Sequence, residues 1–444
     1  MKSFILTLVA ITLLCSSYAQ EQQKRWALND CILYAVANSP KTNKQKQQNS
    51  IYHQNYLEAI GALLPEISAG TSAGFNLGRG LDETNSYVDI NSFSNNYNLS
   101  ASLTIFDGLA NYAKLKIGQI SKIQGKQQLE EAKDMVAYDT MEAYLNALYN
   151  KDLVNIAQEQ LSESTKSLEQ LKRMEELGLK GLSDVAEAES KFAEDRYNLT
   201  RQKNLLTIGI IILKEKMNFP IDKELDIVNE SYSMIINKIT ETPLSIYEES
   251  RLFNPKAQIA ESALKIQKLN HKASKGSLMP RISVGAGLSS NFFRYMDGSD
   301  YASFQEQIKN KRGEYISFSL SIPIFSGFSR TASVKRAKAQ MYMAQTDRDD
   351  ILRKLYSDIE QAVADTNGQV DEYEQAVKRK DAAQIAHNVN QRKYEEGMID
   401  PIILQTSSNR LIKAKAEELN AKYKYHLKYK LVHYYMGEPL YVEN

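Results

Sequence analysis

Two short segments, one in each half of the chain, alternate between apolar and small polar side chains. In the segment from Tyr315 to Arg330, a serine or a proline separates successive apolar residues, which are Ile316, Phe318, Leu320, Ile322 and Ile324. The segment 97–106 has the same alternation, with asparagine, serine and threonine between its apolar residues. A period of two predicts β-strands with one apolar and one polar face.

A glycine turn and a long helical pattern follow each of these predicted strands. The strand–helix junctions are Asp107-Gly108 and Ser326-Gly327, and the runs 109–177 and 328–396 contain no proline. A helix of either length would extend about 100 Å at about 1.5 Å per residue. The sequence therefore predicts helices longer than an ordinary globular domain.

The first long helix carries two apolar stripes. One is a heptad seam with many small members: Val136, Thr140, Ala143, Ala147, Asn150, Val154, Ala157, Leu161, Ser164, Leu168 and Leu171. The other contains Met141, Leu145 and Leu148. Two stripes indicate neighbours on two sides, as in a bundle or a tube of helices. A two-stranded coiled coil remains an alternative for the first stripe.

The remaining segments complete a coarse plan of each half. Residues 26–40 predict a helix broken at Pro40, residues 41–63 a polar helix, and the stretch after Pro65 a strand that a loop at 78–96 connects to the next. Gly178 and Gly181 end the long helix, and Ser183-Asp184 offers an N-cap for a return helix to Met217. Two prolines and weak periodicity predict irregular structure over 218–250.

The second half repeats this order. Pro255 and Pro280 follow Pro40 and Pro65 by 215 residues, whereas Phe325, Gly327, Gly397 and Met436 follow Phe106, Gly108, Gly178 and Met217 by 219. The difference falls in the loop 290–314, which indicates a duplicated unit with one insertion. The expected organisation is a signal peptide 1–19, a first structural repeat 20–217, an equatorial linker 218–250, a second repeat 251–437 and a tail 438–444.

Four strands of about ten residues match the length that crosses an outer membrane, but four strands cannot close. Unpaired edges are costly in lipid, so several chains would have to share one barrel. Three chains giving twelve strands leave a wider interior than two giving eight. The polar face would then line a wet lumen with Asn98, Ser100, Ser102, Ser317, Ser319 and Ser321.

Charge and the N-terminus narrow the class of protein. The net charge of +1, from 55 basic and 54 acidic residues, gives no footprint for nucleic acid. Lys2, an apolar run and Ser17-Tyr18-Ala19 predict a secretory signal cleaved after Ala19. Leu14 is too bulky before Cys15 for a good lipoprotein site, and Cys31 is expected to be a packed apolar residue.

From Trp26 to Gly437, the chain resembles the TolC-like outer-membrane efflux protein (outer membrane factor) family. The duplicated strand–glycine–helix junctions and the hairpin tips at 177–185 and 394–404 carry the resemblance. It implies a mainly α homotrimer in which each protomer gives four strands to a shared twelve-stranded barrel and long helices to a periplasmic tunnel. It also implies the outer membrane of a Gram-negative bacterium, with an exit duct for a tripartite efflux pump or type I secretion system that has an adaptor and an inner-membrane pump as partners.

The resemblance further implies that the helical tips close the periplasmic entrance. On it, Asp184 lies at the acidic latch position and Tyr394 at the tyrosine position, while the arginine position is Ile399. An N-cap role for Asp184 and a helix-packing role for Tyr394 remain alternatives. The tips expected to dock the adaptor are Leu177, Gly178, Leu179, Gly397 and Met398.

The acidic ring of the family is missing from its usual places. Those positions are Ile403 and Thr406, so Asp400 is at most a displaced substitute in the latch. The five histidines, His53, His271, His387, His426 and His433, form no HExxH motif, and neither GxSxG nor a phosphate-binding loop occurs. Each histidine is expected on the surface or in a helix contact, and neither enzymatic activity nor a cofactor is expected.

A structural or adhesive coiled-coil surface protein without a channel is the competing interpretation. It accounts for the long helices and the signal peptide but gives the four strands and the two similar halves no role. A periplasmic enzyme lacks a clustered nucleophile, metal site or acid–base set.

Overall fold

The computed structural model describes residues 25–81, 84–89, 91–228, 236–296 and 302–442. The predicted signal peptide, including Cys15, lies outside these residues. The chain divides into two compact units. A helical unit contains residues up to Lys46, Gln128–Ala257 and from Leu352 onward, and a sheet unit contains Gln47–Gln127 and Gln258–Ile351. Each unit is described by itself.

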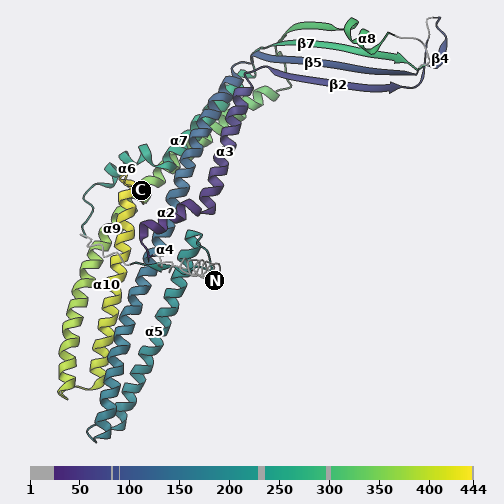
Figure 1. Cartoon of the computed structure of the whole chain (residues 1–444). Coiled ribbons are helices and arrows are strands. Elements are labelled where there is room, and N and C mark those ends of the chain that lie inside the picture. The colour runs from purple at the N-terminus through teal and green to yellow at the C-terminus, as the bar shows by residue number, and fades with distance from the viewer. Residues whose placement is uncertain (1–24, 82–83, 90, 229–235, 297–301, 443–444) are drawn as a thin grey trace, which may run out of the picture. The chain divides into compact units, whose positions relative to one another are not determined.

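Four long helices supply most of the helical unit: α4 (Ala110–Glu176), α5 (Leu182–Met217), α9 (Ser329–Glu395) and α10 (Pro401–Tyr435). Their parts in this unit run side by side (Figure 1). Ser408 on α10 bonds to Gln160 on α4 at 3.2 Å, and Lys191 on α5 to Asn409 on α10 at 3.3 Å. Within the described residues, no helix combines the length and the apolar character needed to cross a membrane.

The predicted heptad seam of α4 is buried or half-buried along its length. Its first part, from Val136 to Ala147, lies in one buried cluster with α2 (Leu28–Asn38), whose Cys31 is fully buried as expected. The parallel pair β1 (Arg25–Trp26) and β6 (Asp226–Ile227) lies beside this cluster. The Tyr144 hydroxyl on α4 donates to the Val228 carbonyl at 2.6 Å and ties the segment 226–228 to the long helix.

The helices of the two halves have nearly equal lengths. α2 and α6 (Pro243–Phe253) have 11 residues each, α3 (Pro40–Gly61) and α7 (Pro255–Gly276) have 22 each, and α4 and α9 have 67 each. The duplication itself stays a prediction. The segment 218–250, predicted to be irregular, contains β6 and most of α6, because Thr242 caps a helix that has proline at its first position.

The sheet unit holds an antiparallel sheet of β2 (Glu66–Asn76), β5 (Ser92–Phe106), β7 (Arg281–Tyr295) and β8 (Gly313–Ser321), in the order β2-β5-β7-β8. The small hairpin β3 (Arg79–Leu81) and β4 (Tyr87–Asp89) lies in the predicted loop 78–96. Helix α8 (Phe304–Asn310) lies in the longer second loop. β8 ends before Ile322 and Ile324 because Pro323 has no N–H to donate.

The pairing register gives the sheet two chemically different faces. The two hairpins have matching registers: Ala69 pairs with Leu99 in the first, and Val284 with Phe318 in the second. Because paired residues share a face, one face is mainly apolar along β5, β7 and β8. The other carries the small polar residues Asn98, Ser100, Ser102, Ser317, Ser319 and Ser321, as the alternation predicted.

Candidate functional site: the helical tips and the strand–helix junctions

Each pair of long helices reverses at a glycine tip. Gly178 and Gly397 have φ of 71° and 72°, a region that favours glycine. The N–H of Leu179 donates to Met174 and that of Met398 to Lys393, both at 2.8 Å, which closes the last helical turn in the same way at each tip. Six large apolar side chains around the tips are exposed: Leu177, Leu179, Leu182, Met398, Ile402 and Ile403.

Asp184 begins its helix by an arrangement other than the predicted one. α5 starts at Leu182 with Gly181 as the N-cap, so the expected cap at Ser183-Asp184 is displaced. The reason is that the Asp184 carboxylate reaches back and accepts the Gly181 N–H at 3.2 Å. The Lys180 ammonium lies 4.0 Å from the same carboxylate. Asp184 therefore stabilises the helix start and holds Lys180 nearby.

Lys180 also connects the two tips. Its ammonium lies over the Tyr394 ring of α9, 5.8 Å from the centroid. Burial, followed by the charges of Asp184, Glu187 and Asp400, raises the pKa of Tyr394. The hydrogen bonds of the described residues include none between Tyr394 and Asp184, so Lys180 joins them instead. Sequence reasoning missed Lys180, and only its position two residues after Gly178 could have pointed to it.

Asp400 serves as the N-cap of α10. Its carboxylate accepts the Ile402 N–H at 2.8 Å, and Pro401 follows at the first helical position. This hydrogen bond uses one carboxylate oxygen of Asp400 to cap its own helix. Ile399, at the expected arginine position, provides no cation, so Lys180 is the cation that the structure places near the tyrosine.

A buried polar layer lies along α4, α9 and α10. The His387 Nδ1 lies 3.2 Å from the Ser407 hydroxyl, and Ser408 contacts Gln160. Burial lowers the pKa of His387, which favours its neutral form. This histidine lies in a helix contact, one of the two places expected for histidines.

The strand–helix junctions share a backbone conformation but differ in their contacts. Gly108 and Gly327 have φ of 69° and 56°, and the Asp107 carboxylate accepts the Asn111 N–H at 3.0 Å at the start of α4. A Cβ added to Gly108 would lie 2.1 Å from the Gly276 carbonyl oxygen, whereas one added to Gly327 would meet nothing within 4 Å. The Ser326 carbonyl accepts the Ser329 hydroxyl at 2.9 Å in the corresponding turn.

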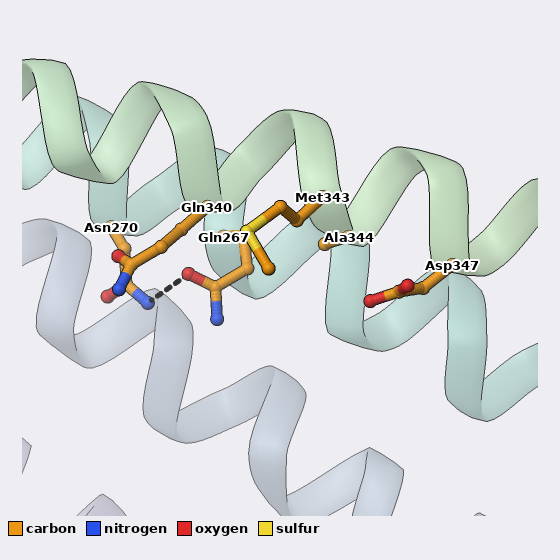
Figure 2. Close-up of a pocket in the computed structure, with 6 residues that line it drawn as sticks. All are labelled: Gln267, Asn270, Gln340, Met343, Ala344 and Asp347. Carbon is orange, nitrogen blue, oxygen red and sulfur yellow. Dashed lines mark hydrogen bonds between the residues drawn. The ribbon is translucent and has the colours of Figure 1, made fainter.

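An open groove of about 390 Å³ lies between α7 and α9 in the sheet unit (Figure 2). Amide side chains, Met343, Ala344 and Asp347 line it, and Asn270 donates to Gln267 at 3.2 Å within it. Asp347 is the single titratable side chain among these lining residues, so they do not supply the two groups that general acid–base catalysis uses. In the part of the chain that the structure describes, no three His, Cys, Asp or Glu side chains gather closely enough to hold a metal.

The comparisons with known proteins decide the family. The family model described as "Outer membrane efflux protein" matches residues 34–214 and 247–437, which cover most of the chain. The chain belongs to the outer membrane efflux protein family. This confirms the resemblance inferred from the junctions and the tips.

Individual relatives of this efflux-family chain agree with the assignment. It is 22% identical to the outer membrane protein TolC of Vibrio cholerae over 413 residues, covering 90% of this chain and 88% of the relative. It superposes on the outer membrane channel CmeC of Campylobacter jejuni with a TM-score of 0.79 at 15% identity, covering 92% and 85% of the two chains. For the open state of the MtrE channel of Neisseria gonorrhoeae the TM-score is 0.76 at 17% identity, with 93% and 89% covered.

Membership settles the place and the general class of this efflux protein. It is an outer-membrane protein that extends into the periplasm, and its relatives are channels rather than enzymes. The roles of Asp184, Tyr394 and Asp400 in a latch, and of the exposed tips in docking, stay predictions.

Proposed function

We propose that this efflux-family protein is the outer-membrane exit duct of a tripartite efflux pump or type I secretion system. Three copies share one twelve-stranded barrel, and their long helices form a periplasmic tunnel. The duct is passive, so an inner-membrane pump supplies the energy, and the tips meet a periplasmic adaptor. The observation that carries the proposal is a two-faced sheet with two open edges.

The open edges require further strands. β2 and β8 are the outer strands of the sheet, and both are exposed along their whole lengths. Because lipid offers no hydrogen bonds to backbone groups, a sheet in a membrane must close. The apolar face suits lipid and the polar face suits water, which supports a barrel completed by copies of the same chain.

The internal similarity of the two halves gives a register for the strand pairing between neighbouring copies, in which β8 of one copy would pair with β2 of the next. Within the chain, the seam between β5 and β7 pairs Leu99 with Leu288. Adding 219 to the first position and subtracting 215 from the second gives Phe318 and Ala73. We therefore expect Phe318 of one copy to pair with Ala73 of the next when β8 meets β2.

The glycines support the same seam. Gly108 and Gly276 approach so closely that a Cβ on either would lie 2.1 or 2.2 Å from the other's carbonyl oxygen. Their counterparts by the same offsets are Gly327 and Gly61, around which a Cβ would meet nothing within 4 Å. If Gly327 of one copy met Gly61 of the next as Gly108 meets Gly276, neither position could carry a Cβ. Glycine at both positions therefore fits a contact between copies.

A cysteine cross-link tests the duct. Phe318→Cys with Ala73→Cys should form an intermolecular disulfide and a covalent trimer in outer-membrane preparations. Phe318→Cys with Ser72→Cys is the matched control, because Ser72 lies on the opposite face and should not react. Cys31 is buried and common to both. Equal cross-linking of the two pairs, or none with a folded protein, would contradict the shared barrel and favour the coiled-coil surface protein.

Channel recordings test the latch. Asp184→Ala with Tyr394→Ala should raise the conductance of reconstituted trimers, because it removes both the carboxylate and the ring that hold Lys180 between the tips. Unchanged conductance would contradict the latch role and leave Asp184 only its role at the start of α5.

Bulky substitutions at Gly178 and Gly397 test adaptor docking. They should abolish efflux if the tips dock the adaptor, and intact efflux would argue against docking there.

A further inference from the structure

We propose that α8 lies in the headgroup layer of the outer leaflet and contacts the phosphates of its lipids. This inference rests on the proposed barrel, because it takes the apolar face of the sheet as the lipid-facing one. It concerns a helix in the second loop that the barrel itself does not require. Figure 1 shows α8 alongside β7 near the end of the strands.

Aromatic contacts hold α8 on the apolar face. The Phe304 ring centroid lies 5.5 Å from that of Phe292 and 6.1 Å from that of Tyr97. The Ser290 hydroxyl on β7 donates to the Ile308 carbonyl at 2.7 Å. Ser290 pairs with Tyr97 in the register, so both lie on the same face. α8 is therefore fixed at the level of Tyr97.

Gln307 fastens the helix to the strand. Its side chain is only 5% exposed, and its Oε1 accepts the Phe293 N–H at 3.1 Å and the Lys311 ammonium at 2.7 Å. Its Nε2 donates to the Ala302 carbonyl at 3.0 Å. With these polar groups satisfied, α8 is part of the folded sheet unit and not a loosely attached loop.

The other side of α8 is polar. Four residues that face away from the sheet are exposed: Gln305, Glu306, Lys309 and Asn310. Placing this surface in hydrocarbon would bury charges at a cost of several kcal/mol. Because the opposite side of the same helix covers aromatic rings on the apolar face, α8 fits the boundary between lipid chains and water.

The strand lengths place that boundary at the same level. From Tyr97 to Phe106, β5 would rise about 30 Å, or about 23 Å after a tilt of about 40°, which matches an apolar band about 25 Å tall. All 15 residues of β5 would give about 36 Å after the same tilt, which is too tall. The part of β5 before Tyr97 therefore projects beyond the hydrocarbon, and α8 marks where it leaves.

The side chains around α8 agree with this depth. Aromatic rings gather at this end of the face, where Phe75 contacts Phe93 and Phe93 contacts Phe292, and such girdles mark membrane interfaces. Lys309 and Arg294 are exposed there. The ion pairs of the described residues include neither cation, so both can face lipid phosphates.

Tryptophan fluorescence tests the depth of α8 in reconstituted trimers. Trp26 is the single tryptophan, so Trp26→Phe gives a silent background into which Phe304→Trp places a reporter. Lipids brominated near the headgroup should quench it most strongly, and quenching should weaken as the bromine moves deeper. Quenching by aqueous iodide without any by brominated lipid, or strongest quenching at the bilayer centre, would overturn the proposal.

Two further reporters separate this proposal from the barrel. Leu320→Trp on the apolar face should be quenched by deep bromines, and Ser319→Trp on the polar face by iodide. If these two fail, the barrel fails; if they succeed and Phe304→Trp does not respond as described, only the placement of α8 fails. Should Phe304→Trp not fold, a nitroxide on Gln305→Cys reports the same depth, with Cys31 buried.

The phosphate contact has its own variant. Lys309→Glu should weaken the binding of trimers in detergent to short-chain phosphatidylglycerol by about fivefold or more, because a cation near anionic lipid contributes about 1 kcal/mol. Lys335→Glu, an exposed position on α9, is the control and should bind as the unsubstituted protein does. Equal binding by Lys309→Glu and the unsubstituted protein would contradict the phosphate contact.

Discussion

The two halves of the chain turn at corresponding positions but surround those turns with different side chains. Among the described residues, eight of the nine with left-handed backbone occur in pairs that are 219 positions apart, Asn85 being the exception: Gly108 and Gly327, Leu109 and Phe328, Gly178 and Gly397, and Asn218 and Gly437. The side chains near them differ. Lys180 corresponds to Ile399, and Asp134 corresponds to Arg353. The two halves therefore share the backbone conformation at these turns, although the side chains around the turns make different contacts in each half.

The glycines at the two strand–helix junctions also differ in their contacts, and the difference bears on the proposed association of copies. The junction of the first half meets α7 of the second at Gly276, whereas the junction of the second half has open space around Gly327. The junction of the first half is in contact within the chain, and in the proposed barrel a neighbouring copy would supply the corresponding contact of the second half.

The largest difference is expected between Gly276→Ala and Gly61→Ala. A Cβ at position 276 would lie 2.2 Å from the Gly108 carbonyl oxygen, so the backbones must separate at a cost of about 3 kcal/mol. A Cβ at position 61 meets nothing within the chain, so the fold should tolerate it and only trimer formation should weaken. Urea midpoints of the detergent-solubilised monomer and trimer yields measure the two effects. Equal midpoints would contradict the comparison.

Asp134 should give the first half a pH dependence. Burial raises its pKa to about 6 although Tyr434 donates to it at 2.8 Å. The folded state then holds this proton more tightly than the unfolded state, so the contribution of Asp134 to stability is fully present below about pH 4 and is lost as pH rises to about 6. Allowing for its partial exposure, the loss is about 1–2 kcal/mol.

Unfolding at pH 4.5 and 7.5 checks this expectation. Asp134→Asn should flatten the difference between the two pH values. Tyr434→Phe should move the transition to higher pH, because it removes a donor that favours the carboxylate. An unchanged slope in Asp134→Asn would show that another group titrates.

Gly178→Ala and Gly397→Ala should have equal and smaller effects. Both glycines have left-handed φ, and neither has an atom within 4 Å of an added Cβ, so the cost is about 1 kcal/mol of backbone strain at each. Hydrogen exchange at the two tips should increase by the same factor. Unequal exchange would reveal a contact at one tip that the other lacks.

The smallest effect is expected from Lys180→Gln. The exposed cation–π contact with Tyr394 is worth about 0.5–1 kcal/mol, which corresponds to a two- to fivefold change in an opening equilibrium. Open probability of single channels should rise by that factor. Ile399→Gln, at the corresponding place in the other tip, is the control and should leave it unchanged.

Periodicity predicted the regular elements, because long helices and alternating strands leave patterns within one segment. The proline-free runs became α4 and α9, and the glycines after them became the tips. β8 is shorter than its apolar alternation suggested because Pro323 lacks an N–H, and β5 begins before Tyr97 because pairing with β2 and β7 extends it into a polar segment.

Contacts between distant segments were not visible in the sequence. Lys180 meets Tyr394 only when the two tips lie together, and Gly276 meets Gly108 only when α7 passes the junction. α8 has seven residues, too few for a periodic signal, and depends on Gln307 for its attachment. In each case the missing information is which elements are neighbours in space.

The seam between β5 and β7 also sets an order for folding. Each hairpin joins strands close in sequence, so either can form on its own. Pairing Leu99 with Leu288 instead closes a loop that contains all of α4 and α5. Because such high contact order is slow to satisfy, the seam should be the late step in folding of the single chain. Until it closes, four strand edges per chain are exposed, and an unpaired edge is a site of aggregation.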